Sequence, residues 1–463
     1  MNFSHSVITG GNFVRHNTNP SVNGFERLFN MAAPCAFHNS AERFDPPKCH
    51  ENTRVAVLKK IMDWILRQDP DTRDAIVMWL YGAAGAGKSA IAQSLAEMCY
   101  GSNKLLASFF FSRNHPLRGN ARALVATLAY QLVVNLPPGT QVREHIAATI
   151  EHNPLIFAQS LEEQFLSLIV SPLKQLAESG FFANPDSPRL IIIDGLDECD
   201  KSPVQCNIIR TIFQLIHSQR LPILFLIASR PETEICLAFD APSSIPILAR
   251  LALDDEYGSF DDIRRFLYDK FTEIKQTHQI KNHIPRSWPT QDVVEALVRK
   301  SSGQFIYAST VIKFVGSSRH RPTDRLDIIL GIRPGNGSAP FAELDALYTN
   351  ILSRVDDVVN VLHILSLLIL KPSNFWPDDN LEAFLSLKPG DISLILSDLG
   401  SLLSLEHLAG FPEPTILHAS LKDFLLDSSR SKDFHVNPVE RHNEYALLSF
   451  QHLKSELLQT LFT

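Results

Sequence analysis

Residues 82–89 read GAAGAGKS and match the phosphate-binding pattern G-x-x-x-x-G-K-[ST] at every required position. A hydrophobic run ends just before this stretch at Tyr81, and an apolar-periodic segment follows it from Ala90. Glycines let successive backbone N–H groups turn inward, and a helix N-terminus adds positive potential, so a strand, loop and helix in this order form an anion cradle. The stretch predicts a site for the phosphates of ATP or ADP in an α/β fold. The alternative is a glycine-rich turn that binds no nucleotide.

Two side chains of this stretch carry specific expectations. Lys88 is expected to reach the β- and γ-phosphates, and Ser89 is expected to ligate Mg²⁺. The other cofactor-binding residues expected here lie around the loop and the start of the helix: Gly82, Gly85, Ala86, Gly87 and Ala90.

A second chemical signal is an aspartate at the end of a hydrophobic run. Residues 189–194 read RLIIID, which predicts a buried strand that delivers Asp194 to the carboxyl end of the sheet, where α/β folds bind ligands. Asp194 is therefore the expected carboxylate on the Mg²⁺ side of the site, beside Ser89. An additional apolar run at residues 105–111 supports this assignment. P-loop ATPases with such an inserted strand keep the lysine and the aspartate far apart in sequence and adjacent in the sheet.

Three more residues are candidates for catalysis. Asp197 and Glu198 come three and four positions after Asp194. Either could polarise the attacking water, and the alternative is that they cap the following helix. Arg230 follows the apolar run at residues 222–229, where a cation would meet the γ-phosphate and report its presence. The alternative for Arg230 is an ordinary surface arginine.

Short β-rich runs alternate with helical stretches over the first half of the chain. The runs are almost continuously apolar, as expected of strands buried on both faces of a parallel sheet. They occupy residues 75–81, 105–111, 189–194, 222–229 and 245–251. The stretches between them are long enough for right-handed crossovers, and include residues 89–100, 121–134, 161–177 and 204–217. The sequence thus predicts an α/β P-loop core, a parallel sheet with helices on both faces.

The pattern changes along the chain in a way that predicts five segments. Residues 1–45 are rich in Asn, Ser, Gly and His and are expected to form a flexible N-terminal extension. Residues 46–254 form the expected nucleotide-binding domain. The β-rich runs largely stop there, which predicts a helical domain over residues 255–355. Residues 356–435 mix helices with two short apolar runs, as in a winged-helix domain, and residues 436–463 predict a C-terminal helix.

Composition limits the classes of function. The chain has 463 residues, 45% hydrophobic and 20% charged, the balance of a globular protein with two or three packed units. Its net charge of −7 gives no electrostatic footprint for nucleic acid, so no nucleic acid partner is expected. The N-terminus lacks the features of a secretory signal, and the longest apolar stretch, from Val358 to Leu370, is too short to span a bilayer. A cytoplasmic protein with no membrane partner is expected.

The cysteines also fit a reducing compartment, because the six of them show no framework spacing. A zinc site is one interpretation of four residues near the N-terminus: Cys35, His38, Cys49 and His50. Adjacent residues such as Cys49 and His50 make a poor tetrahedral pair, so an ordinary loop is expected there instead.

In these motifs the chain resembles the NACHT branch of signalling P-loop ATPases (the STAND class), in particular fungal NLR-like proteins with nephrocystin-like N-terminal regions. The resemblance covers roughly residues 44–455 and rests on several motifs in combination. Besides GAAGAGKS these are SFFFSR at 108–113, DGLDE at 194–198, IASRPE at 227–232 and KSSGQFIYASTVIKF at 300–314. The resemblance implies an ATP/ADP-binding switch in intracellular recognition or in innate-immune or incompatibility signalling.

The resemblance also implies roles for residues outside the predicted sheet. Residues 416–424, ILHASLKDF, resemble a winged-helix motif whose histidine contacts the β-phosphate of ADP, which makes His418 a cofactor-binding candidate. The segment from Asn52 to Arg54 stands where relatives contact the adenine. The chain departs from many animal and plant relatives at residues 303–305, where Gly-Gln-Phe stands in place of a G-x-P motif that packs on the base.

The implied switch is closed with ADP, which joins the sheet to the winged-helix domain through Lys88 and His418. Exchange for ATP would open it for homo-oligomerisation and for unidentified protein partners. Hydrolysis is expected to be slow at most, because Gly195 places no carboxylate directly beside Asp194. The alternatives are a remodelling ATPase and a nucleotide-binding scaffold without turnover. The segment VITGGNF at residues 7–13 is a candidate signalling or self-assembly motif, with a flexible tail as the alternative.

Overall fold

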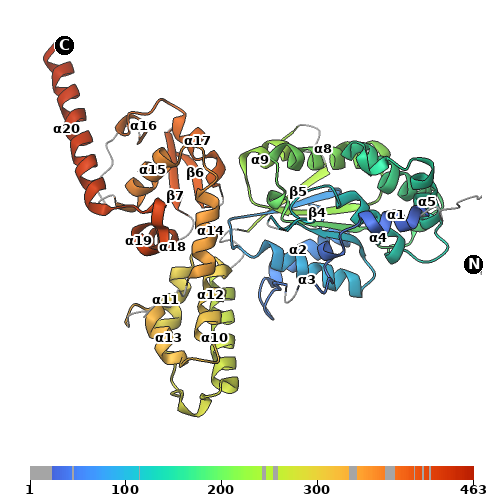
Figure 1. Cartoon of the computed structure of the whole chain (residues 1–463), viewed down its shortest axis with the longest axis horizontal. Helices are drawn as coiled ribbons and strands as arrows, with labels where there is room; N and C mark the ends of the chain where they lie inside the picture. The colour runs from blue at the N-terminus through green and yellow to red at the C-terminus, as the bar shows by residue number, and fades with distance from the viewer. Residues whose placement is uncertain are drawn as a thin grey trace, which may run out of the picture.

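The computed structural model describes residues 23–43, 46–113, 115–241, 247–253, 259–332, 341–370, 381–400, 402–408, 411–416 and 419–462. The N-terminal part of the chain forms an α/β half, and the rest forms a second half of helices and a small β-hairpin (Figure 1). Two features predicted above, the motif at residues 7–13 and His418, lie outside the described residues. In the part of the chain that is described, no helix is both long and apolar enough to cross a membrane.

The α/β half is built on a parallel sheet of five strands. The strands are β1 (Val77–Tyr81), β2 (Leu105–Phe110), β3 (Leu190–Asp194), β4 (Leu224–Ser229) and β5 (Leu248–Ala252). Their order is β2-β3-β4-β1-β5, and every neighbouring pair is parallel. The predicted α/β core with its five apolar runs is therefore confirmed. Strands β1 to β4 are almost continuously apolar because helices cover both faces of the sheet, whereas the edge strand β5 carries the exposed Arg250.

One prediction about this sheet was wrong. Strand β4 lies between β1, which leads into the glycine-rich loop, and β3, which ends at Asp194. The strands that carry the lysine and the aspartate are therefore not adjacent. Lys88 and Asp194 still interact electrostatically, because parallel strands bring their carboxyl ends to the same edge of the sheet.

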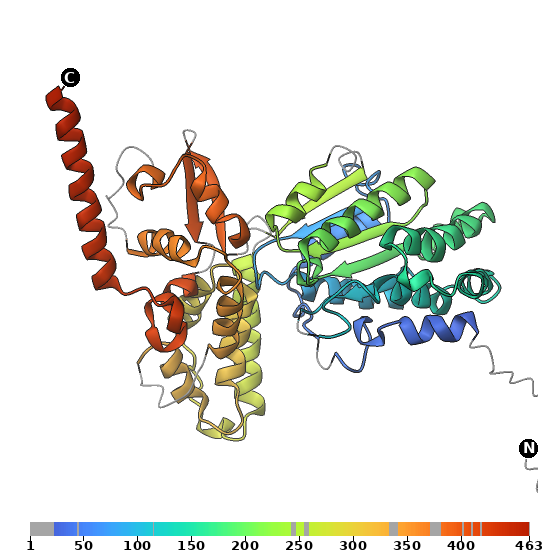
Figure 2. The same cartoon turned by 45° about the horizontal axis from the view of Figure 1, so that its top comes forward.

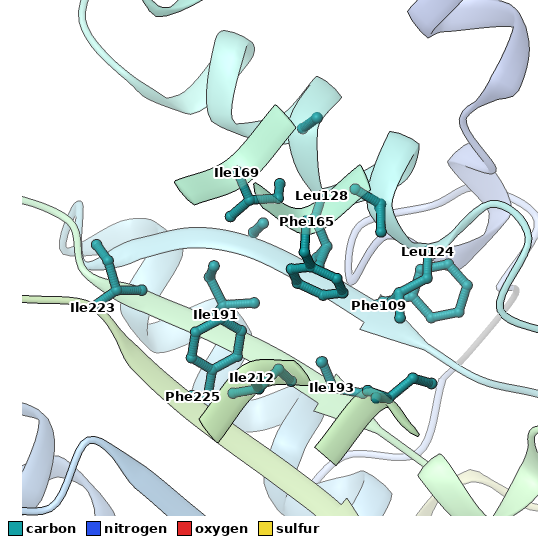
Figure 3. Packing of buried hydrophobic residues seen from close by; sticks show 14 of the residues in the cluster. Phe109, Leu124, Leu128, Phe165, Ile169, Ile191, Ile193, Ile212, Ile223 and Phe225 are labelled. Carbon is teal, nitrogen blue, oxygen red and sulfur yellow. The ribbon is translucent and has the colours of Figure 1, made fainter. Parts of the chain in front are cut away.

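The helices of this half form two layers. One face of the sheet carries α2 (Val55–Ile65) and α3 (Lys88–Gly101). The other face carries α4 (Leu124–Asn135), α5 (Val142–His152), α6 (Leu161–Phe165), α7 (Ser171–Glu178), α8 (Ser202–Gln219) and α9 (Thr233–Phe239). Figure 3 shows the core on this second face, where Phe109, Ile191 and Phe225 of the sheet meet Leu128 of α4 and Phe165 of α6.

Residues 23–43, called the N-terminal arm below, correct the expectation of a flexible extension over residues 1–45. The arm contains α1 (Gly24–Met31), whose Leu28 is completely buried in the core of the second face. Further along the arm, the backbone N–H of Ala33 donates a hydrogen bond to Thr127 Oγ1 of α4 at 2.9 Å. The arm buries few large side chains and is held largely through its backbone. Its composition therefore did not indicate packing, and a flexible extension was expected instead.

Replacing Gly24 by alanine is expected to detach α1 from α5. A Cβ atom at this position would lie 2.1 Å from the backbone oxygen of Ala147, which cannot move aside as a flexible side chain would. Overpacking of this kind costs about 1–3 kcal/mol, so hydrogen exchange of the arm should accelerate by roughly 5- to 150-fold. Gly101→Ala is the matched control, because a Cβ there meets nothing within 4 Å. Equal exchange of the arm in the two variants would contradict this packing.

The second half begins with helices α10 (Ser259–Thr277), α11 (Gln291–Ser301), α12 (Phe305–Val315), α13 (Pro322–Ile329) and α14 (Ala342–Leu352). They are followed by α15 (Val358–Leu370), α16 (Leu381–Phe384), α17 (Asp391–Ile395), β6 (Leu403–Leu408), β7 (Phe411–Ile416), α18 (Ala419–Leu426), α19 (Ser428–Ser431) and α20 (Pro438–Phe462). Strands β6 and β7 form an antiparallel hairpin at the two predicted apolar runs. Figure 2 shows α20 extending away from the rest of the chain, on the side opposite the α/β half.

One hydrophobic core runs through both groups of helices in the second half. Tyr348 of α14 illustrates this continuity, because its hydroxyl is 2.7 Å from Ser420 Oγ of α18 and its ring is 5.3 Å from that of Phe424. The core is therefore continuous past residue 355, where the boundary between the helical domain and the winged-helix domain was predicted. That boundary stays a prediction.

Candidate functional site

The glycine-rich loop joins the carboxyl end of β1 to the N-terminus of α3. Gly85 and Gly87 have φ angles of +79° and +97°, in the left-handed region that glycine enters without steric cost. Gly87 directly precedes the first helical residue, Lys88. The free N–H groups of the first turn of α3 are thus at the end of the loop, as an anion site requires.

The loop is also packed against the second half of the molecule. The N–H of Ile306 on α12 donates to the oxygen of Gly85 at 3.4 Å, and a Cβ on Gly85 would lie 2.3 Å from Ile306 Cγ2. Ala84 is buried in the core formed by the helices of that half. Glycine at position 85 therefore serves both the backbone conformation of the loop and its close approach to α12.

Lys88 is turned back onto its own loop. Its Nζ donates hydrogen bonds to the carbonyl oxygens of Gly82 and Ala83, at 2.8 and 2.9 Å. Desolvation is the largest influence on the ammonium group and lowers the pKa of Lys88 to about 8, while the carboxylate of Asp197 opposes this fall. A bound anion would therefore favour the charged form of this lysine.

Asp194 ends β3 and is 3% exposed. The Ser89 side chain is hydrogen-bonded to its carboxylate, whereas Asp194 Oδ1 has no hydrogen-bond partner among the described residues. Burial raises the pKa of Asp194 to about 7, and the hydrogen bond from Ser89 opposes this rise. A hydroxyl beside an unpartnered carboxylate oxygen suits Mg²⁺, which prefers oxygen ligands. The two predicted metal-binding residues are thus brought together.

Asp197 binds Arg230. Arg230 donates to both oxygens of the carboxylate, from its backbone N–H to Oδ1 at 2.9 Å and from Nε to Oδ2 at 3.1 Å. Asp197 is 2% exposed, and the Arg230 side chain is 13% exposed. Arg230 is therefore a largely buried, ion-paired residue at the end of β4, and the described contacts of the Asp197 carboxylate are with this arginine rather than with the start of α8.

Glu198 has a different environment from its neighbour Asp197. Its Oε2 accepts a hydrogen bond from the backbone N–H of Arg113 at 3.2 Å. Burial, and after it the charge of Asp197, raise the pKa of Glu198. Of the two carboxylates expected to polarise water, Glu198 is thus the one that is not paired with an arginine side chain among the described residues.

Arg113 is a site residue that was not predicted from the sequence. It follows β2, and its Nη2 donates to the backbone oxygen of Asp197 at 2.6 Å. Its Nη1 donates to Asn350 Oδ1 of α14, in the second half of the chain, at 3.4 Å. The signal that could have identified Arg113 is its position at the end of the apolar run SFFFSR, which parallels the position of Arg230 after β4.

Arg43, from the N-terminal arm, also contributes a cation close to the site. Its guanidinium lies 3.8 Å from the ring centre of Phe110, and Nη1 donates to Gln93 Oε1 of α3 at 2.8 Å. Phe110 is paired with Asp194 in the register of β2 and β3, so their side chains share the α3 face of the sheet. The charge of Arg43 accordingly favours the ionised form of Asp194. No sequence signal predicted this, because the arm was expected to be unstructured.

Arg54 joins the segment expected to contact the base to the loop. It is 4% exposed, and its Nη2 donates to the oxygen of Ala86 at 2.9 Å. Its guanidinium carbon lies 5.1 Å from the ring centre of Phe305, in the Gly-Gln-Phe segment. Nε and Nη1 of Arg54 have no hydrogen-bond partner among the described residues. The segment expected to contact the base thus meets, beside the loop, the segment that stands in place of the G-x-P motif of relatives.

The four residues of the zinc alternative do not come together. His50 pairs with Asp269 at 2.9 Å, and His38 Nδ1 lies 3.3 Å from Ser108 Oγ. Within the described residues, the one group of three potential metal ligands consists of Cys35, Glu42 and His115. Nδ1 of this histidine accepts a hydrogen bond from Leu117 N–H, which places the ring proton on Nε2, the atom that faces Glu42. Among the described residues, Cys35, His38, Cys49 and His50 therefore do not form one cluster of metal ligands, and Cys35 lies in a short 3-10 helix, Pro34–Ala36, rather than in a loop.

Comparison with known proteins gives a family match over part of the chain. Residues 55–230 match the family model described as "Nephrocystin 3, N-terminal". No curated protein matches the chain. Among solved structures, the Aeropyrum pernix Orc1 protein in complex with DNA matches 80% of this chain and 90% of its own, with 16% identity and a TM-score of 0.37. Drosophila ORC bound to DNA matches 83% of this chain and 97% of its own, with 11% identity and a TM-score of 0.37.

The expectation that there is no nucleic acid partner is corrected. It was drawn above from the net charge of the whole chain alone. The physical reason is that a charge summed over a whole chain does not report the charge of any one surface. A net charge of −7 therefore does not exclude a nucleic acid partner.

Proposed function

We propose that this chain, a P-loop NTPase, is an ATP/ADP-binding switch of the NACHT type, closed with ADP and opened for self-association by ATP. The observation that carries the proposal is that both halves of the chain meet at the phosphate end of one site. Ile306 of α12 packs on Gly85 of the loop, and Thr233, three residues after Arg230, donates to the oxygen of Ser397 at 2.7 Å. A ligand that displaces this loop therefore acts on the arrangement of the halves.

The nucleotide would be held by the loop and the residues around it. Lys88 and the N–H groups at the start of α3 would bind phosphate oxygens, and Ser89 and Asp194 would hold Mg²⁺. Mg²⁺ would neutralise phosphate charge there. Arg54 has two buried donors that find no partner among the described residues, and its guanidinium lies near the ring of Phe305, which supports a base or ribose contact by this segment.

Slow hydrolysis is part of the proposal. Both oxygens of Asp197 are engaged by Arg230, and position 195 is a glycine at a φ of +69°, which places no carboxylate directly beside Asp194. Glu198 is then the remaining candidate to polarise water. Turnover well below 1 s⁻¹, the lower end of typical enzyme rates, is the expected behaviour.

The test is to purify the full chain without added nucleotide, denature it and identify the nucleotide that is released. Retained ADP, close to one molecule per chain, is the expected result. Empty protein with rapid ATP turnover would contradict the switch and support a remodelling ATPase. Mass photometry with MgADP and with MgATPγS should show larger assemblies only with the triphosphate, and a constant size would contradict the self-association.

A further inference from the structure

We infer that Asp197 is a positioning residue that holds two arginines, Arg230 and Arg113, as links between the phosphate end of the site and the second half of the chain. Asp197, its two arginines and their contacts with the second half are called the Asp197 latch below. The inference rests on the proposed function and adds to it the means by which phosphate state reaches the second half.

The first link runs through Arg230. The carboxylate of Asp197 holds the backbone N–H and the Nε of Arg230 together, which fixes both the arginine side chain and the start of the segment that follows it. In that segment the oxygen of Pro231 lies so close to Gly400 that a Cβ on this glycine would approach it to 2.8 Å. Thr233 Oγ1 donates to the oxygen of Ser397 at 2.7 Å. Ser397 and Gly400, just before β6, thus pack against residues 231–233, which directly follow Arg230.

The second link runs through Arg113. Its Nη2 is bound to the backbone oxygen of Asp197, and its Nη1 to Asn350 of α14. Because α14 and α18 share one core through Tyr348, a change at this contact acts on the same hydrophobic core as a change at Ser397. Both links therefore start at one buried aspartate and end on the second half.

Charge couples the latch to the loop. Lys88 interacts electrostatically with Asp197, Arg230, Asp194 and Glu198. The γ-phosphate, which ATP has and ADP lacks, would compete with Asp197 for Arg230. The phosphate and the carboxylate are both anions in a buried setting, where charges are weakly screened. Movement of Arg230 away from Asp197 displaces the attached residues 231–233, which carry the contacts to Ser397 and Gly400. ADP leaves the latch closed, and ATP opens it.

The experiment removes each link without touching the loop. Thr233→Val deletes the hydroxyl that binds Ser397, and Asn350→Ala deletes the acceptor of Arg113. The matched control is Thr272→Val, because Thr272 is exposed and its hydroxyl donates to the backbone oxygen of Tyr268 within its own helix, α10. Hydrogen exchange of residues 342–352 and 397–408 is measured on the full chain with MgADP and with MgATPγS, and affinity for a fluorescent ADP is measured separately.

In the unmodified chain, exchange of both segments should be roughly 2- to 10-fold faster with MgATPγS than with MgADP, as expected for the loss of one or two hydrogen bonds. In Thr233→Val and Asn350→Ala the affinity for ADP should stay within about threefold, while exchange with MgADP rises to the level of the triphosphate state. Thr272→Val should behave as the unmodified chain.

The outcomes separate the latch from the proposed function. If the unmodified chain and the variants bind ADP but the two nucleotides give the same exchange in every chain, the Asp197 latch is wrong and nucleotide binding stands. If the link variants keep the difference between MgADP and MgATPγS, the latch is also wrong. If the unmodified chain binds no nucleotide, the proposed function fails and the latch fails with it.

Discussion

Replacing Lys88 by alanine is expected to weaken binding of MgADP and MgATP by roughly 10- to 150-fold. A hydrogen bond to a charged group contributes about 1.5–3 kcal/mol, and tenfold in affinity corresponds to about 1.4 kcal/mol. The variant should remain folded, because the alanine removes a buried cation whose present partners are two carbonyl oxygens of its own loop. Titration of a fluorescent ADP measures the affinity, and thermal unfolding measures the stability.

A second measurement ties this loss to the charge of Lys88. Desolvation lowers the pKa of Lys88 to about 8, so roughly half of the chains carry a neutral lysine at pH 8. Phosphate binding favours the charged lysine, and calorimetry in two buffers of different ionisation enthalpy should detect proton uptake in the unmodified chain. Lys281→Ala, at an exposed lysine, is the control and should bind as the unmodified chain does. Undiminished affinity in Lys88→Ala would place the nucleotide elsewhere.

The sequence was sufficient to predict the sheet and the centre of the site. GAAGAGKS is a specific signal because its glycines, its lysine and its serine all serve phosphate binding. RLIIID can be recognised as a buried strand because such a strand must be apolar up to its functional residue. The order of the strands could not be derived in the same way. Insertion of β4 between β1 and β3 depends on crossover connections, which leave no local trace in either strand.

Contacts between distant segments account for the other differences. Asp197 and Arg230 are 33 positions apart, and either alone is compatible with catalysis, capping or a surface position. Their pairing appears only when β3 and β4 lie side by side. The N-terminal arm was missed for a related reason. Its stability comes from close approach at Gly24 and from backbone hydrogen bonds to Thr127 and Ser108, which hydrophobic periodicity does not register.

Asp194→Asn is expected to stabilise the nucleotide-free chain at pH 8 and to abolish its response to Mg²⁺. Burial raises the pKa of Asp194 to about 7, from an ordinary value near 4. Between these two pH values the folded chain holds a proton that the unfolded chain has released, so the free energy of unfolding falls as pH rises from about 4 to 7. At pH 8 the carboxylate therefore costs stability, by a few kcal/mol at most, since one pKa unit corresponds to about 1.4 kcal/mol.

Asparagine keeps the size of Asp194 and can still accept the hydrogen bond from Ser89, but it carries no charge. The gain in unfolding free energy should be largest at pH 8 and shrink toward zero as pH falls to about 4. Asp186→Asn is a control of opposite sign, because the hydrogen bond from Lys104 lowers the pKa of this exposed carboxyl. That variant should lose a little stability above about pH 4 and show no difference below it.

The functional half of the prediction uses the same variant. MgATP should raise the thermal midpoint of the unmodified chain more than ATP with a chelator does, because binding to the folded state alone stabilises it. Asp194→Asn should lose this difference between the two conditions. If asparagine leaves both the pH dependence and the Mg²⁺ response unchanged, Asp194 is neither a strained buried charge nor a metal ligand. If the pH dependence and the Mg²⁺ response change together, the Asp194 carboxylate lowers the stability of the nucleotide-free chain because it is placed to bind Mg²⁺.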